Sequence, residues 1–252
     1  MRAFAINTLA LLSAVQTVTA AATVYLAGDS TMAATGANDG DTAGWGAYLT
    51  GYISLAVSNQ AIGGRSARSY TREARFSAIT PLLKSGDYVV IEFGHNDGGS
   101  LTPTDNGRTD CSPSGTNYST TCTTVYNGVT ETVLTFEKYL VNAANAFKAK
   151  GANVIISSQT PNNVWEGGVY AYTPGRFVGY ASDAAAEAGV TFVDHGLYMA
   201  ALFNKQGSTV VNAYYPNDHT HTSPVGANVA ARAFVLALEA TNSTLKSYIT
   251  HD

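Results

Sequence analysis

Five short, largely apolar segments recur along this chain, and they constrain its fold more than any other feature. Each is four to six residues long and lacks the strict polar alternation of a strand with one face in water. Strands that are covered on both faces of a parallel sheet have this character. We therefore expect strands at Thr23–Ala27, Ala56–Ala61, Tyr88–Phe93, Asn153–Ser157 and Val190–Val193.

Helix-like stretches separate these segments. Gly151 is well placed to end the third helix, and Ser223 and Pro224 suit the N-cap and first position of the last one. The alternation predicts an α/β fold, a doubly wound three-layer α/β/α sandwich with a mainly parallel five-stranded sheet. The predicted helices are Trp45–Ile53, Arg72–Lys84, Glu131–Lys150, Arg176–Ala188 and Pro224–Ala240.

Composition, charge and the absence of repeats or long linkers limit the domain organisation and the class of protein. Hydrophobic residues make up 45% of the 252 residues and charged residues 13%, which suits a folded chain. The net charge of −4 excludes the broad basic surface of a nucleic-acid binder. No repeat or long linker divides residues 23–252, so we expect a single domain. Residues 97–128 form the longest irregular stretch, and loops of this length are often functional.

The N-terminus has the layout of a secretory signal peptide. Arg2 precedes an apolar stretch from Ala3 to Val15, and small residues follow up to Ala22. The stretch is too short, and too interrupted by polar residues, for a membrane span. The alternative is a buried N-terminal helix. We expect residues 1–22 to be a signal peptide and the protein to be secreted, without a membrane partner.

The two cysteines fit the same interpretation. Cys111 and Cys122 lie in a polar stretch, and in an oxidising compartment we expect them to pair. A free reactive thiol is the alternative, but no basic residue lies close to Cys122 to activate it. Asn117 and Asn242 begin N-glycosylation sequons, as secretion would allow.

Ser30 is the candidate nucleophile. It lies in the sequence Gly28-Asp29-Ser30-Thr31 directly after the first predicted strand, where an open parallel sheet presents functional groups. A serine hydroxyl becomes a strong nucleophile only when a base removes its proton, and a carboxylate usually orients that base. The alternative is that Ser30 is a helix N-cap.

Asp218 and His221 are the candidate partners of this serine. They lie just before the last predicted helix, and two intervening residues allow the carboxylate to hold one imidazole nitrogen while the other faces Ser30. His219 is a competing base that needs a sharper turn. Asp218 could instead cap a turn beside surface histidines, or the three side chains could bind a metal, the weakest option because no second ligand cluster accompanies them.

The oxyanion formed in acyl transfer needs preorganised donors. Asn96 offers a side-chain amide, Gly64 offers a backbone N–H without an obstructing Cβ, and the N–H of Ser30 is a third candidate. Both Gly63-Gly64 and Asn96–Gly99 could be mere turns, but each follows a strand at the edge that carries Ser30. The chain has no Gly-x-Ser-x-Gly elbow, phosphate-binding loop or dinucleotide fingerprint.

Together these blocks resemble the SGNH (GDSL) hydrolase superfamily, and over the whole mature chain they are similar to the fungal rhamnogalacturonan acetylesterases. The resemblance implies a flavodoxin-like fold, no metal or other cofactor, a Ser30–His221–Asp218 triad, and an oxyanion hole of Ser30, Gly64 and Asn96. The motifs that carry it are Thr23–Met32, Gly64–Tyr70, Glu92–Asp97, Ser158–Asn163 and Asp218–Pro224.

The resemblance implies acetylated, galacturonate-containing rhamnogalacturonan of pectin as the substrate. Arg65 and Arg68 are candidates for binding its carboxylates, because guanidinium pairs with carboxylate in bidentate geometry. For Arg72 and Arg75, a solvated helix face with salt bridges is as good an interpretation as substrate binding. We expect a monomeric esterase that acts through an acyl-enzyme. The alternative functions are an esterase for acetylxylan, lipid or small acyl esters, and a polysaccharide-binding protein without catalytic activity.

Overall fold

A parallel sheet forms the centre of the protein, in a computed structural model that describes residues 21–252. Most of the predicted signal peptide therefore lies outside the described residues. The strand order is β2-β1-β3-β6-β7, and every neighbouring pair is parallel. All five predicted strands are confirmed, with ends that differ by at most two residues. They are β1 (Thr23–Gly28), β2 (Ala56–Asn59), β3 (Tyr88–Glu92), β6 (Asn153–Ser157) and β7 (Thr191–Val193).

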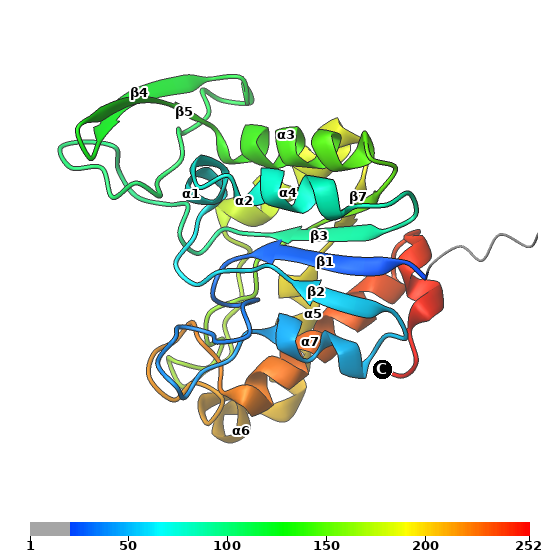
Figure 1. Cartoon of the computed structure of the whole chain (residues 1–252). Coiled ribbons are helices and arrows are strands. Elements are labelled where there is room, and N and C mark those ends of the chain that lie inside the picture. Colours follow the sequence, from blue (N-terminus) through cyan, green and yellow to red (C-terminus); the bar gives the residue numbers. More distant parts are fainter. Residues whose placement is uncertain (1–20) are drawn as a thin grey trace, which may run out of the picture.

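Helices cover both faces of the sheet and complete the predicted three-layer fold (Figure 1). One face carries α1 (Ala67–Arg72), α2 (Arg75–Ile79), α3 (Phe136–Lys148) and α4 (Arg176–Ala188). The other face carries α5 (His195–Gln206), α6 (Ser208–Asn212) and α7 (Pro224–Glu239).

Alternation of side chains along the strands divides the apolar core into two layers. In β1, Val24 and Leu26 pack against the side of α5 and α7, whereas Tyr25 and Ala27 pack against the side of α3 and α4. Successive side chains of a strand point to opposite faces, so a fully apolar strand supplies both layers. This explains why the segments show no polar alternation, and burial of both layers stabilises the sandwich.

Three predicted helices differ from the structure. Two 3-10 turns, Trp45–Ala47 and Leu49–Gly51, replace a helix over 45–53. In place of a helix over Arg72–Lys84, α1 ends at Arg72, and α2 and a 3-10 turn at Thr80–Leu82 follow, because Ala74 between α1 and α2 adopts a left-handed backbone with φ 59°. The prediction of a helix from Glu131 is wrong at its start, since α3 begins only after its N-cap Thr135.

The residues before α3 instead form an antiparallel hairpin of β4 (Thr121–Tyr126) and β5 (Val129–Leu134). Valine and threonine recur here, and β-branched residues favour strands. Figure 1 shows the hairpin projecting beyond the main sheet on the side where β1 and β3 end. Helices α5 and α6 and the final 3-10 turn, Thr244–Tyr248, were not predicted.

The long irregular stretch is covalently tied to this hairpin. Cys111 and Cys122 form a disulfide with a Cα–Cα distance of 5.4 Å, which confirms the predicted pair. Asn117 and Asn242 are exposed, so both sequons are accessible. Within residues 21–252, no helix is long and apolar enough to cross a membrane.

A buried polar cluster joins the layers beneath the edge where the strands end. Glu92 at the end of β3 accepts hydrogen bonds from Trp45 Nε1 at 2.8 Å and from Ser157 Oγ at 2.7 Å. His195 Nδ1 lies 2.8 Å from the same carboxylate, and its Nε2 lies 2.8 Å from the carbonyl of Ala230 in α7. Because both imidazole nitrogens face acceptors, the cluster fixes α5 and α7 against the sheet.

Candidate active site

Ser30 lies in a tight turn directly after β1, at the carboxyl edge of the sheet. Asp29 Oδ1 accepts hydrogen bonds from the backbone N–H and the hydroxyl of Thr31, both at 2.9 Å. The N–H of Ala33 also donates to the Asp29 carbonyl at 2.9 Å. The turn is therefore held from both sides, and it presents a nearly buried Ser30 hydroxyl.

His221 and Asp218 complete a hydrogen-bonded chain with this serine. Ser30 Oγ lies 2.8 Å from His221 Nε2, and His221 Nδ1 lies 2.7 Å from Asp218 Oδ2. Partial burial alone would raise the pKa of Asp218, but hydrogen bonds from the imidazole and from the N–H groups of Thr220 and His221 lower it below the ordinary value. The carboxylate thus stays ionised and fixes the imidazole with Nε2 toward Ser30.

The loop that carries the histidine is anchored on two sides. Ala43 donates its N–H to the Thr222 carbonyl at 2.9 Å, and Asn163 donates its N–H to the His219 carbonyl at 2.7 Å. Ser223 caps α7 by accepting a hydrogen bond from Gly226, as predicted. The segment that ends in Asn163 therefore supports the histidine loop.

Gly64 and Asn96 follow β2 and β3, the two strands that flank β1. Gly63 abuts the serine, since a Cβ built on it would lie 3.7 Å from Ser30 Cβ. Gly64 has a φ of +74°, which favours glycine, and among the described residues no atom outside residues 63–65 lies closer than 4.0 Å to the position of its missing Cβ. Asn96 Nδ2 donates to the carbonyl of Arg65 at 3.1 Å, which places this amide beside the glycine loop.

The structure also shows which of the two histidines, His219 or His221, contacts Ser30. His219 Nδ1 lies 3.1 Å from Glu166 Oε1, and both side chains are exposed. It is His221 that contacts Ser30. Among the described residues, no group of three His, Cys, Asp or Glu side chains could hold a metal ion. The site is thus a serine, a base and a carboxylate beside N–H donors, an arrangement suited to acyl transfer.

Comparison with known proteins agrees with this geometry. The family model described as GDSL-like Lipase/Acylhydrolase matches residues 24–234. The chain belongs to this family. It is 57% identical over 250 residues, 99% of this chain and 96% of the relative, to a rhamnogalacturonan acetylesterase of Emericella nidulans. A rhamnogalacturonan acetylesterase of Bacillus subtilis is 28% identical over 90% of this chain and 93% of its own length.

The fold of this GDSL-family esterase also recurs in solved structures. An acetylxylan esterase of Geobacillus stearothermophilus matches with a TM-score of 0.57 and 16% identity, over 87% of this chain and 95% of that one. This likeness concerns the fold.

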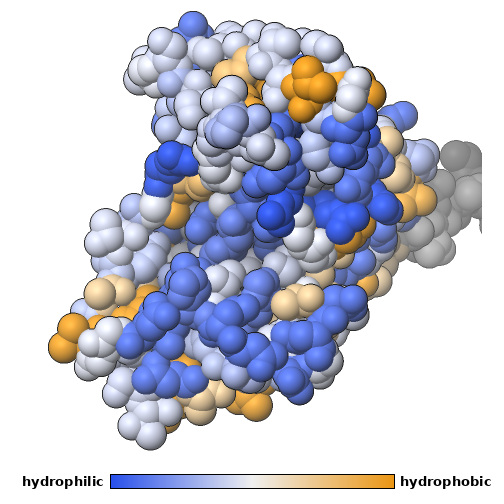
Figure 2. Space-filling view, turned by 90° about the vertical axis from the view of Figure 1, so that its left-hand side faces the viewer, coloured by the Kyte–Doolittle hydropathy of each residue, from blue (hydrophilic) through white to orange (hydrophobic). Residues whose placement is uncertain are grey.

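Figure 2 looks onto the face where the strands end, and hydrophilic side chains gather across its middle. The chain is a carboxylic-ester hydrolase of the α/β three-layer type.

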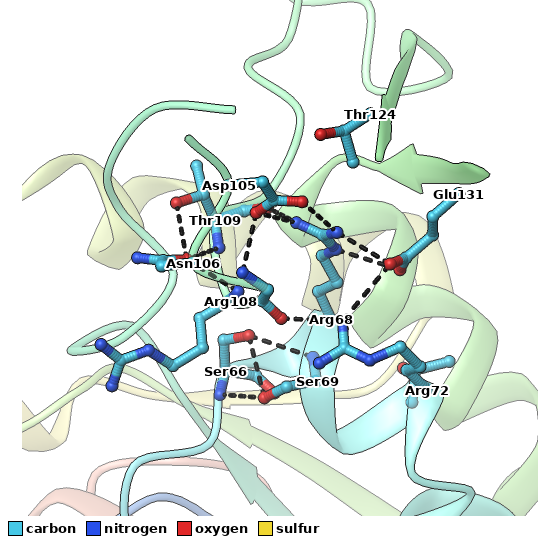
Figure 3. A network of polar contacts seen from close by, with 12 residues as sticks. Ser66, Arg68, Ser69, Arg72, Asp105, Asn106, Arg108, Thr109, Thr124 and Glu131 are labelled. Atoms are coloured by element: carbon cyan, nitrogen blue, oxygen red, sulfur yellow. Dashed lines mark hydrogen bonds and ion pairs between the residues drawn. The ribbon is translucent and has the colours of Figure 1, made fainter. Parts of the chain in front are cut away.

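The prediction that Arg68 contacts substrate is wrong. Its side chain is fully buried, with bidentate contacts to Asp105 at 2.7 and 3.0 Å and to Glu131 at 2.8 and 3.0 Å (Figure 3). The carbonyl of Thr109 accepts a further hydrogen bond. Because every side of the guanidinium has a partner, Arg68 joins α1 to the hairpin and to the long loop.

The other arginines of this cluster also have protein partners. Arg65 is half-buried, and its guanidinium contacts Glu73 at 3.2 Å and the Gly63 carbonyl at 3.0 Å, so it supports the glycine loop. Arg75 pairs with the same glutamate at 3.4 Å. Arg72 contacts Glu131 at 3.4 Å and lies over the Tyr126 ring. A salt-bridged, solvated surface therefore describes Arg75, whereas Arg72, which also donates to the Gly107 carbonyl at 2.8 Å, joins α1 to the hairpin and the long loop.

Arg108 is the residue that sequence reasoning missed. It comes from the long irregular loop, and its Nη1 donates to Asn96 Oδ1 at 3.1 Å. The loop length was the one available signal, because an isolated arginine 44 positions after Gly64 has no spacing that connects it to the site. The fold brings them together through the contacts that Arg68 makes with residues 105–109.

Proposed function

We propose that this protein is a secreted carbohydrate esterase that releases acetate from the acetylated rhamnogalacturonan backbone of pectin. The observation that carries the chemistry is the hydrogen-bonded chain from Ser30 through His221 to Asp218. The substrate is supported by the 57% identity, over nearly the whole chain, to the Emericella nidulans enzyme of that name.

The reaction proceeds in two steps through an acyl-enzyme. His221 Nε2 accepts the Ser30 proton as Oγ attacks the acetyl carbonyl, and the N–H groups of Ser30 and Gly64 with Asn96 Nδ2 stabilise the oxyanion. The C–O bond to the sugar breaks, and the protonated imidazole gives its proton to the leaving alcohol. Water, deprotonated by His221, then attacks the acetyl-serine, and acetate leaves while Ser30 regains its proton.

Acetate release from acetylated rhamnogalacturonan, measured beside acetylxylan and 4-nitrophenyl acetate, tests this function. We expect the pectic polymer to be preferred and Ser30→Ala to abolish release at unchanged thermal stability. Equal or faster release from acetylxylan would keep the esterase chemistry and overturn the pectic substrate. Binding of the polymer without hydrolysis of any ester would favour the polysaccharide-binding protein without catalytic activity.

The organisation of the chain is part of the proposal. We infer that residues 1–22 are a removed signal peptide and that residues 23–252 fold as one monomeric domain. The disulfide and the two exposed sequons support secretion. Mass spectrometry of protein secreted from a fungal host would find an N-terminus near Thr23 and glycans at Asn117 or Asn242. Retention of residues 1–22 in the secreted protein would contradict the inference.

A further inference from the structure

Arg108 is a cation at the active site without an acidic partner. Among the described residues, no carboxylate lies within ion-pair distance of it, whereas Arg65, Arg68, Arg72 and Arg75 each have one. The only protein partner of its guanidinium in residues 21–252 is Asn96 Oδ1, at 3.1 Å. Arginine has five N–H donors, so Nε, Nη2 and the second hydrogen of Nη1 are available to a ligand.

The backbone around Arg108 is held rigidly. Asn106 Oδ1 accepts hydrogen bonds from the N–H groups of Arg108 at 2.8 Å and Thr109 at 3.1 Å. Asp105 Oδ1 accepts from Gly107 at 2.8 Å, and the same carboxylate is fixed by the buried Arg68. Figure 3 shows the Arg108 side chain leaving this cluster in the direction away from Arg68. The backbone that carries the guanidinium is therefore already ordered before a ligand binds, which reduces the entropy lost on binding.

The guanidinium lies at the margin of the proposed oxyanion hole. Its Nη1 contacts Asn96 and lies 4.0 Å from the position that a Cβ of Gly64 would take, closer than any other atom outside residues 63–65. A sugar ester whose carbonyl oxygen sits between Gly64 and Asn96 would therefore have Arg108 beside the reacting acetyl group. The residue is partly exposed, so a substrate can reach it.

We propose that Arg108 binds a uronate carboxylate of the substrate next to the acetyl group that is removed. This proposal rests on the proposed function and assigns the selectivity for an acidic over a neutral acetylated polymer to one side chain. A guanidinium accommodates a carboxylate with two parallel N–H···O hydrogen bonds, which a lysine cannot reproduce. Because the carboxylate does not change during acyl transfer, the contact strengthens binding of ground state and transition state alike, and its loss is felt mainly in KM.

Arg108→Gln and Arg108→Lys test the proposal, with Arg75→Gln as the control for loss of an exposed arginine nearby. Each is assayed on acetylated rhamnogalacturonan, on the same polymer with its carboxylates methyl-esterified, and on 4-nitrophenyl acetate. For Arg108→Gln we expect kcat/KM on the charged polymer to fall about 10- to 100-fold, mostly through KM, as for a charged hydrogen-bond partner. Arg108→Lys falls less, and Arg75→Gln is unchanged.

The comparison between substrates decides the outcome. We expect the loss on the charged polymer to exceed the loss on the methyl-esterified polymer and on 4-nitrophenyl acetate by at least about tenfold. Equal losses on all three would mean that Arg108 only positions Asn96, and no loss on the charged polymer would mean that it binds nothing; either result overturns the proposal. A wild-type enzyme that is inactive on the charged polymer but active on acetylxylan overturns the proposed function as well, and is recognised before any variant is made.

Discussion

The residue before the nucleophile determines how Ser30 is presented. Asp29 is fully buried, and its carboxylate holds the backbone and the hydroxyl of Thr31, so the turn after β1 has little freedom. A Cβ on Gly28 would lie 2.7 Å from the Glu92 carbonyl, so only glycine allows β1 and β3 to approach at this point. Gly28 and Asp29 therefore have structural reasons, and the catalytic proposal concerns only Ser30.

Replacing Asp218 separates orientation from chemistry. Asp218→Asn keeps the size of the side chain but removes the charge that holds His221 Nδ1–H, which lies 2.7 Å away. We expect kcat to fall by about 10⁴-fold, as when the orienting carboxylate of a serine triad is lost. The measurement is the initial rate of acetate release, with circular dichroism as the control for folding. A loss of less than tenfold would remove Asp218 from the triad.

Replacing Asn96 tests the proposed oxyanion hole. Asn96→Ala removes an amide that also bridges the Arg65 carbonyl and Arg108. We expect turnover to fall by about 10²- to 10³-fold, the usual cost of one oxyanion donor. We expect kcat to decrease as much on 4-nitrophenyl acetate as on the polymer, because every ester forms the same oxyanion during acyl transfer. Full activity in a folded variant would exclude Asn96 from the site.

At the scale of the elements, one buried side chain holds three segments together. Arg68 of α1 contacts Asp105 of the long loop and Glu131 of β5. Breaking a buried ion pair by removing one partner leaves an uncompensated charge, which costs about 3–5 kcal/mol. The hairpin and the loop that carries Arg108 thus depend on α1 for their position.

Arg68→Met therefore destabilises the fold, by about 3–5 kcal/mol in the free energy of unfolding. Arg75→Gln, which removes a contact between exposed side chains, is the matched control and should cost no more than about 1 kcal/mol. Urea unfolding followed by tryptophan fluorescence compares the two variants. Equal stabilities would show that the contacts of Arg68 contribute nothing net.

The sequence predicts the elements whose pattern is local and misses those that tertiary contacts create. Apolar strands and the capped helices α4 and α7 are read directly from periodicity and end signals. The sequence does not predict α5, because its apolar residues follow β7 with little polar alternation, and it assigns β4 to the irregular stretch and the end of β5 to α3. In the site, spacing relates Asp218 to His221, but no local signal distinguishes the buried Arg68 from an exposed arginine or relates Arg108 to Asn96.

At the scale of the whole molecule, buried carboxyl groups determine how stability depends on pH. Burial raises the pKa of Asp29, Asp97, Asp110 and Glu137, that of Asp97 to about 7. Such groups hold their protons more tightly in the folded state, so the stability they contribute is present at low pH and lost as pH rises toward the folded pKa. Asp105, Glu131 and Asp218 behave oppositely. Despite some burial, hydrogen bonds lower their pKa values, and their contribution is lost as pH falls through the folded values.

We therefore expect the midpoint of thermal unfolding to be highest at about pH 4–5 and to fall between pH 5 and 8. Asp97 and Asp110 are neighbours, since the Asp110 backbone N–H donates to the Asp97 carbonyl at 3.0 Å, and after burial the charge of Asp97 is the next cause that raises the pKa of Asp110. Asp110→Asn keeps the size of the side chain but removes its charge, so it should flatten the decrease between pH 5 and 8. Scanning calorimetry across this range measures the unfolding midpoint of the wild-type protein and of Asp110→Asn. Parallel curves of midpoint against pH would show that Asp97 and Asp110 do not control the pH dependence.

The central claim is that Ser30 forms the covalent acyl-enzyme, and active-site labelling tests it most directly. The protein is treated with diethyl 4-nitrophenyl phosphate, and the modified peptide is identified by mass spectrometry while acetate release is followed. The account predicts one adduct per chain, on Ser30, formed in step with the loss of activity and absent from the Ser30→Ala and His221→Ala variants. Inactivation with the adduct on another residue, or a Ser30→Ala variant that still releases acetate, would contradict it.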